Sequence, residues 1–106
     1  MEAYKQLLNS VPHKNRLVLE TCFNFVKRYE SWQNGNDTCY NTIVNGVNKI
    51  LPDYKRYFIH KMLTVLIENN IIRGVINPFG GIAYVTTIVD ASNYFLYAGP
   101  GNPTRV

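Results

Sequence analysis

The stretch from residue 52 to residue 87 constrains the fold most, because a helical pattern changes there into an extended one. At about 100° per residue, apolar side chains in its first half fall on one side of a helix and polar ones on the other. Pro52 and Asp53 suit a first turn, where proline lacks only an unpaired N–H and a carboxylate favours the helix dipole. We expect an amphipathic helix over residues 52–69, with one apolar face made by Tyr54, Phe58, Ile59, Met62, Leu63, Val65 and Leu66.

A β-hairpin is expected directly after this helix. Asn69 and Asn70 tolerate the left-handed conformation that closes a helix, and β-branched residues favoured in strands occupy much of residues 71–76. Residues 77–81 are rich in turn formers, and residues 82–87 return as a second strand. An isolated hairpin is marginally stable in water, so it must pack against helices.

Helical patterns also precede residue 52. Residues 2–9 predict a short helix or arm, and residues 14–32 and 38–49 predict two amphipathic helices. Gly35 can stop the first of these two helices and Asp37 can cap the second. Gly46 either weakens its helix or lets a neighbouring helix approach closely. Phe23, at the border of the apolar stripe, is either core edge or subunit contact, and core edge is favoured.

The last part of the chain is rich in aromatic residues. Asp90 can cap a short helix, or the aromatic run over residues 94–97 can form an extra strand. Consecutive large apolar residues require cover, either on the core of their own subunit or across a twofold axis with a second copy. Residues 99–106 are expected to be a flexible tail.

Composition limits the possible classes. With 106 residues and 46% hydrophobic content, the chain has material for one core. We expect no secretory signal and no membrane span, and therefore a cytoplasmic or nuclear protein. A net charge of +4 is compatible with a polyanionic partner but does not by itself indicate one.

No catalytic or cofactor site is expected. The seven acidic residues include no pair on one helical face beside a base, and no phosphate-binding glycine loop is present. A zinc site would have to draw on four separated segments that carry His13, Cys22, Cys39 and His60, against the usual ligand spacing. Cys22 and Cys39 are expected to be buried free thiols.

The order helix, loop, helix, short turn, longer helix and hairpin resembles a winged helix-turn-helix domain over residues 14–87. Residues 62–73 are the most specific piece, and they are similar to the end of the recognition helix and the start of the wing in bacterial, archaeal and viral regulators. Asn70 stands where such regulators often have glycine. The resemblance implies an α+β fold with a three-helix core and a wing of two or three strands. Residues 1–13 would then be an arm or short helix, and residues 88–106 an aromatic segment and tail.

The resemblance further implies that helix 52–69 enters the major groove of double-stranded DNA. Arg56 is the candidate for bidentate contact with guanine, and Lys55 and Lys61 are candidates for phosphate contacts. The remaining candidate DNA contacts are Tyr57, His60, Thr64 and, at the base of the first strand, Arg73. His60 either contacts a base or phosphate or is simply solvated.

The expected function is that of a small sequence-specific DNA-binding protein, a homodimeric transcriptional repressor. The alternative is a winged-helix protein-interaction module of phage, virus or plasmid type that modulates a replication, transcription or defence protein. The uncharged wing tip favours the alternative. Its contact residues, which also serve for a dimer, would be Phe23, Phe79, Tyr94, Phe95 and Tyr97.

Overall fold

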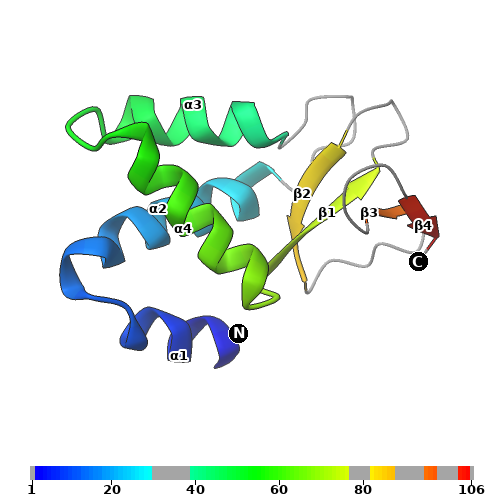
Figure 1. Cartoon of the computed structure of the whole chain (residues 1–106), viewed down its shortest axis with the longest axis horizontal. Helices are drawn as coiled ribbons and strands as arrows, with labels where there is room; N and C mark the ends of the chain where they lie inside the picture. The colour runs from blue at the N-terminus through cyan, green and yellow to red at the C-terminus, as the bar shows by residue number, and fades with distance from the viewer. Residues whose placement is uncertain (1, 30–38, 77–81, 88–94, 98–102, 106) are drawn as a thin grey trace.

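The computed structural model describes residues 2–29, 39–76, 82–87, 95–97 and 103–105 (Figure 1). The fold is α+β, as predicted. The helices come first: α1 (Glu2–Ser10), α2 (His13–Tyr29), α3 (Tyr40–Ile50) and α4 (Arg56–Glu68). The strands follow: β1 (Ile72–Ile76), β2 (Ile82–Thr86), β3 (Phe95–Tyr97) and β4 (Pro103–Arg105). The predicted helix followed by an antiparallel hairpin is confirmed.

Helices α2, α3 and α4 pack around one apolar core. In Figure 1, α4 crosses in front of α2, with α3 above them and α1 below. Helix α2 supplies Val18, Leu19, Cys22, Phe23 and Val26; α3 supplies Ile43, Val44 and Val47; α4 supplies Ile59, Met62, Leu63 and Leu66. Each fully buried aliphatic side chain stabilises the fold by about 1.5–3 kcal/mol. The predicted apolar faces of these three helices are therefore what holds them together.

The N-terminal helix α1 packs on this core through Tyr4, Leu7 and Leu8. None of its residues is fully buried. The ring of Tyr4 stacks on the ring of Phe23, with 3.8 Å between centroids and 13° between planes. Phe23 is only 5% exposed. It belongs to the core, and a role as a surface contact is ruled out by its burial.

Gly46 lies where α2 and α3 approach each other closely. A Cβ placed on Gly46 would overlap the Cε2 and Cζ atoms of the Phe25 ring. Of the two sequence interpretations, close packing of a neighbouring helix is therefore confirmed. Helix α3 begins after Cys39, whose side chain makes no cap hydrogen bond. The helix thus starts at Tyr40, two residues after the predicted start at about Thr38, and Asp37 and Thr38 lie outside the described part of the chain.

Helix α4 begins later than the sequence predicts. Its N-cap is Lys55, and the Tyr54 amide instead donates to the Leu51 carbonyl across a turn, at 3.2 Å. Proline followed by aspartate is as well suited to the centre of a β-turn as to a helical first turn. The predicted start at Pro52 is wrong because this turn is needed to reverse the chain between α3 and α4.

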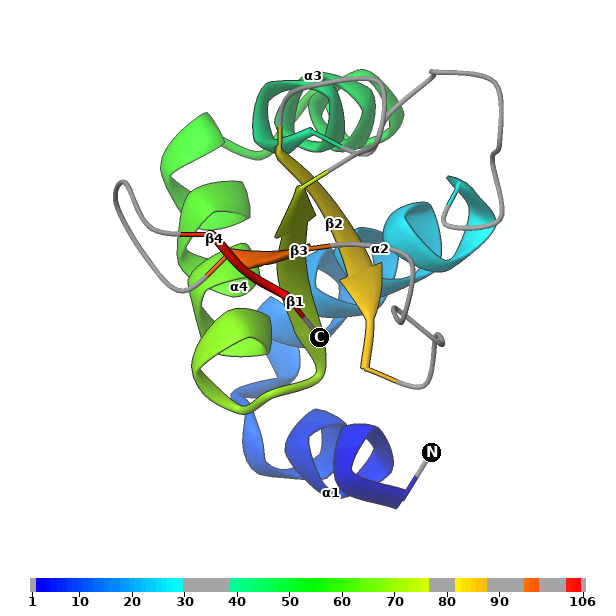
Figure 2. The ribbon, with the colours of Figure 1, turned by 90° about the vertical axis from the view of Figure 1, so that its right-hand side faces the viewer.

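The sheet has the order β2-β1-β3-β4, and its paired strands are antiparallel. Asn70, with φ of 56°, supplies the predicted left-handed residue between α4 and β1. In the β1–β2 register, Gly74 lies opposite Tyr84. Viewed from its open side in Figure 2, the sheet packs against the helices through β1 and β2, while β3 and β4 extend it outward.

The C-terminal segment differs from the expected flexible tail. Strand β3 pairs with β1 of its own chain, with Leu96 opposite Val75, which confirms the extra-strand interpretation. Strand β4 pairs with β3, with Thr104 opposite Leu96, so a flexible tail is wrong for residues 103–105. Proline is tolerated at this position because β4 is an edge strand and needs no outward N–H.

Candidate nucleic-acid interface

Helix α4 is buried on one side and open on the other. The open side follows the i, i+4, i+7, i+11 spacing of a single helical face and consists of Tyr57, Lys61, Thr64 and Glu68, all of them exposed. Tyr57 has 66% of its surface exposed, although it is a large apolar residue. This face is therefore available to a partner along the whole helix.

The N-terminal end of α4 carries two cations and lacks a cap. Lys55 occupies the N-cap position in an extended conformation, and its side chain makes no cap hydrogen bond. Arg56 is the first helical residue, and no acidic residue lies in the first turn. Because this end of a helix is the positive end of the macrodipole, both cations oppose it. An anion placed there would gain from the free amides and from both side chains.

The connection between α3 and α4 is held by a side chain that the sequence analysis missed. The Asn48 amide Nδ2 donates to the Tyr54 carbonyl at 3.0 Å, in a partly buried position. No sequence signal identified Tyr54 as the partner of Asn48. This bond ties the last turns of α3 to the residue before the N-cap of α4.

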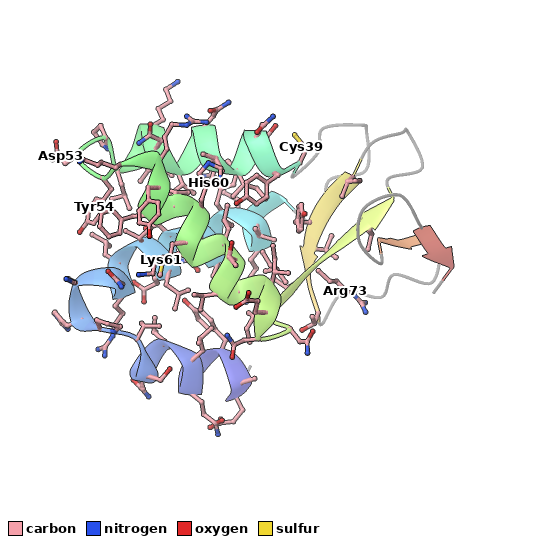
Figure 3. The ribbon with its side chains drawn as sticks, viewed as in Figure 1. Cys39, Asp53, Tyr54, His60, Lys61 and Arg73 are labelled. Carbon is pink, nitrogen blue, oxygen red and sulfur yellow. The ribbon has the colours of Figure 1, made fainter. Side chains whose placement is uncertain are left out.

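His60 is neither free nor simply solvated. Its Nδ1 lies 2.8 Å from the hydroxyl oxygen of Tyr40 on α3. The two rings stack with 5.3 Å between centroids, and the Tyr84 ring of β2 meets Tyr40 edge-on at 5.9 Å. Figure 3 shows His60 between α4 and α3. The second ring nitrogen, Nε2, has no hydrogen-bond partner among the described residues. It is not one of the buried polar atoms that lack a partner, so it is open to solvent.

Tyr40 and Thr64 complete the surroundings of His60. Burial raises the pKa of Tyr40, and the nearby Thr64 hydroxyl opposes that shift. The Thr64 hydroxyl donates to the His60 carbonyl at 2.9 Å. Its hydrogen is therefore engaged within α4, which leaves the threonine methyl group and an acceptor oxygen for a partner.

The predicted DNA contacts divide into two places. Lys55, Arg56, Tyr57, His60, Lys61 and Thr64 all lie on α4 or at its N-cap. Arg73 lies on β1, opposite Val85 and beyond the C-terminal end of α4 (Figure 3). At 1.5 Å per residue, the 13-residue helix puts about 20 Å between its two ends. Arg73 is therefore separate from the cations at the α4 N-terminus.

The predicted partner or dimer contacts are only partly described. Phe79 and Tyr94 lie outside the described residues. Phe95 and Tyr97 belong to β3, whose backbone pairs with β1 and β4. Their place in the sheet shows that this aromatic segment extends the fold of its own chain.

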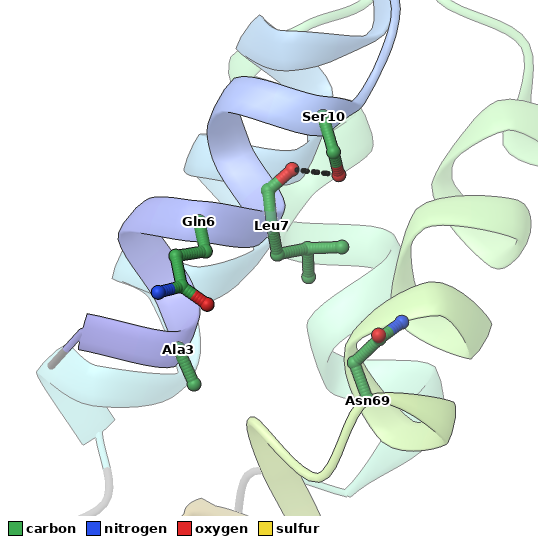
Figure 4. A pocket seen from close by; sticks show the side chains of 5 residues that line it. All are labelled: Ala3, Gln6, Leu7, Ser10 and Asn69. Carbon is green, nitrogen blue, oxygen red and sulfur yellow. Dashed lines mark hydrogen bonds between the residues drawn. The ribbon is translucent and has the colours of Figure 1, made fainter.

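A shallow hollow of about 340 Å³ lies between α1 and the end of α4, lined by Ala3, Gln6, Leu7, Ser10 and Asn69 (Figure 4). The Ser10 hydroxyl donates to the Leu7 carbonyl at 2.8 Å, and both residues belong to α1. None of the five residues is charged. The hollow thus offers no group that would orient a charged ligand.

Comparison of the chain with known protein families, curated proteins and solved structures finds no match. Within the described ranges, no three His, Cys, Asp or Glu side chains cluster in a way that could hold a metal ion. No helix in that same part of the chain has both the length and the apolar character needed to cross a membrane. The geometry of α4 and its neighbours is therefore what indicates a function.

Proposed function

We propose that this chain is a small sequence-specific DNA-binding protein, a dimeric transcriptional regulator that inserts the N-terminal half of α4 into the major groove. The arrangement of α3, a tight turn, α4 and a hairpin is compatible with a winged helix-turn-helix. A helix presented in this way has its apolar face anchored and its outer face free. Both conditions hold for α4.

The uncapped, doubly cationic start of α4 carries the proposal. A lysine at the N-cap in place of Ser, Thr, Asp or Asn costs a helix about 0.5–2 kcal/mol, by analogy with loss of the capping side chain. Lys55 and Arg56 have no acidic residue beside them in the first turn to offset this cost. A phosphate of the DNA backbone would supply both the missing acceptors and the missing negative charge.

Each exposed side chain then has a role that follows from its chemistry. Arg56 has the fork of donors that matches the O6 and N7 acceptors of guanine. Lys55 and Lys61 suit phosphates, which position the protein without selecting sequence. Tyr57 can contact a phosphate or a thymine methyl group. Thr64 is limited to its methyl group or its acceptor oxygen, because its hydrogen is donated to His60.

A protein-interaction module is a second candidate function, and exposed apolar surface favours it. Leu17, Ile50 and Tyr57 are 48%, 57% and 66% exposed among the described residues. In this alternative Tyr57 would contact a protein partner instead of DNA. Phe23 is excluded from the contact residues of this module because its side chain is buried.

The deciding experiment is selection from a random-sequence duplex pool at two salt concentrations, followed by sequencing of the retained DNA. DNA binding predicts an enriched motif with two symmetric half-sites and an affinity that falls with salt. Absence of retention at low salt would refute the proposal and support the protein-interaction module.

Two variants test the assigned roles. Arg56→Ala should weaken the selected site by about 1–3 kcal/mol and relax one base position, whereas Lys61→Ala should weaken all sequences alike. Lys5→Ala is the matched control, because it removes the same charge from an exposed position of α1. Equal loss on every sequence for Arg56→Ala would contradict a base-specific role.

A further inference from the structure

Three aromatic side chains from three different elements meet at the flank of α4. Tyr40 comes from α3, His60 from α4 and Tyr84 from β2, and the Tyr40 ring contacts both others. Its hydroxyl is 2.8 Å from Nδ1 of His60. His60 lies in the N-terminal half of α4, the half proposed to enter the major groove. Its imidazole is thus held from outside its own helix.

The direction of this hydrogen bond determines what His60 can offer. A phenol is a stronger donor than an imidazole N–H, and the unprotonated nitrogen of a neutral imidazole is a strong acceptor, so this chemistry favours Tyr40 as the donor and Nδ1 as the acceptor. Burial raises the pKa of Tyr40, which keeps that proton on the phenol at neutral pH. When Nδ1 accepts, the ring hydrogen of neutral His60 must be on Nε2.

We infer that Tyr40 is a positioning residue that fixes His60 as an Nε2–H donor for a base acceptor in the major groove. The acceptors available there are N7 of adenine or guanine, O6 of guanine and O4 of thymine. The exocyclic amino groups of adenine and cytosine are donors, so an Nε2–H donor disfavours them. The assignment rests on the proposed DNA-binding function of α4. It adds a specificity determinant on α3, a helix that need not contact the base itself.

The testing variant is Tyr40→Phe, which removes the hydroxyl and keeps the ring that stacks on His60. Nitrogen-15 spectra of the histidine rings report which nitrogen carries the proton, and they need no DNA. In the wild type we expect the Nε2–H form for His60, and in Tyr40→Phe a loss of that preference. The chain has one other histidine, the exposed His13, whose spectrum should not change.

Selection from the duplex pool gives the second readout. Tyr40→Phe should lower discrimination at one base position by about two- to twelvefold, the equivalent of one hydrogen bond. Non-specific affinity should be unchanged. In a His60→Ala background, Tyr40→Phe should have no further effect on that position, because it acts through His60. Tyr4→Phe is the matched control, since it removes a hydroxyl from another stacked tyrosine, on α1.

The outcomes separate this inference from the function on which it rests. A wild type that retains no DNA overturns both. A wild type that selects a motif which Tyr40→Phe selects identically overturns the inference alone. Uniform loss of affinity on all sequences would place His60 on a phosphate and overturn its role at a base. An Nδ1–H form in the wild-type spectrum would overturn the assigned direction of the hydrogen bond.

Discussion

Replacement of Lys55 by serine should make the protein more stable and a weaker DNA binder. The backbone of Lys55 already has the extended N-cap conformation, with φ −68° and ψ 147°. Its carbonyl accepts from the Phe58 amide at 3.0 Å. Since the Phe58 amide is already bonded, the Tyr57 amide is the one that would donate to the hydroxyl of a serine at position 55. A side-chain cap contributes about 1 kcal/mol, and removal of a cation from the positive end of the helix adds a few tenths.

Thermal and urea unfolding measure the first effect. A gain of about 1 kcal/mol corresponds to a midpoint about 4–8 °C higher for a domain of this size. Lys61→Ser is the matched control, because it removes the same charge from the exposed middle of α4 where no cap can form. That variant should be unchanged or slightly less stable, since serine is a poorer helix former than lysine.

Binding to the selected duplex, measured over a range of salt concentrations, gives the second effect. If Lys55 contacts one phosphate, Lys55→Ser should reduce the slope of log affinity against log salt by about 0.9. A variant that is no more stable than wild type would show that this helix end is already satisfied. A variant that is more stable but binds DNA with an unchanged slope would refute the phosphate contact.

Three further predictions concern the framework that presents α4. Gly46→Ala should destabilise the wild type by up to about 2 kcal/mol, because the added methyl overlaps the Phe25 ring. In a Phe25→Ala background the same change should stabilise by up to about 1 kcal/mol, and absence of this reversal in urea unfolding would contradict the close approach. Asn70→Ala should cost about 1 kcal/mol at a φ of 56° while Asn70→Gly should not, and equal stability of the two variants in thermal unfolding would contradict a left-handed residue here. Burial raises the pKa of the Cys22 thiol from 9.0 to about 12, and burial with nearby negative charge raises the pKa of the Tyr4 hydroxyl from 10.0 to about 12. The unfolded chain therefore loses protons that the folded chain keeps, so the free energy of unfolding should fall as pH rises from about 9 to 12, and an increase over that interval in urea titrations would contradict their burial.

Elements whose order depends on burial could be predicted from the sequence. Apolar residues at helical spacing located α1, α2, α3 and α4, and the last three of these helices each bury one face against the same core. The change to β-branched residues after Asn70 located the hairpin for the same reason. The left-handed conformation of Asn70 was predictable because few other residues tolerate it.

Boundaries and pairings that depend on other segments could not be predicted. Pro52 with Asp53 satisfies a helix start and a β-turn equally, and only the Tyr54 to Leu51 hydrogen bond shows which applies. Residues 103–105 look like a tail in composition. Their order comes from pairing with β3, a contact that composition does not encode.

At the proposed interface, too, local placement could be predicted and contacts with other segments could not. Periodicity correctly placed Arg56, Tyr57, Lys61 and Thr64 on the exposed side of one helix, because that placement needs only local geometry.

Periodicity could not show what holds this helix and its side chains. Asn48 binds the chain before α4, and Tyr40 binds His60, twenty positions away in the sequence. Both holding groups lie on α3. If DNA is the partner, base preference will therefore depend on α3 as well as on α4. Transfer of residues 55–68 alone to another scaffold should keep the phosphate contacts of Lys55 and lose the discrimination that depends on Tyr40.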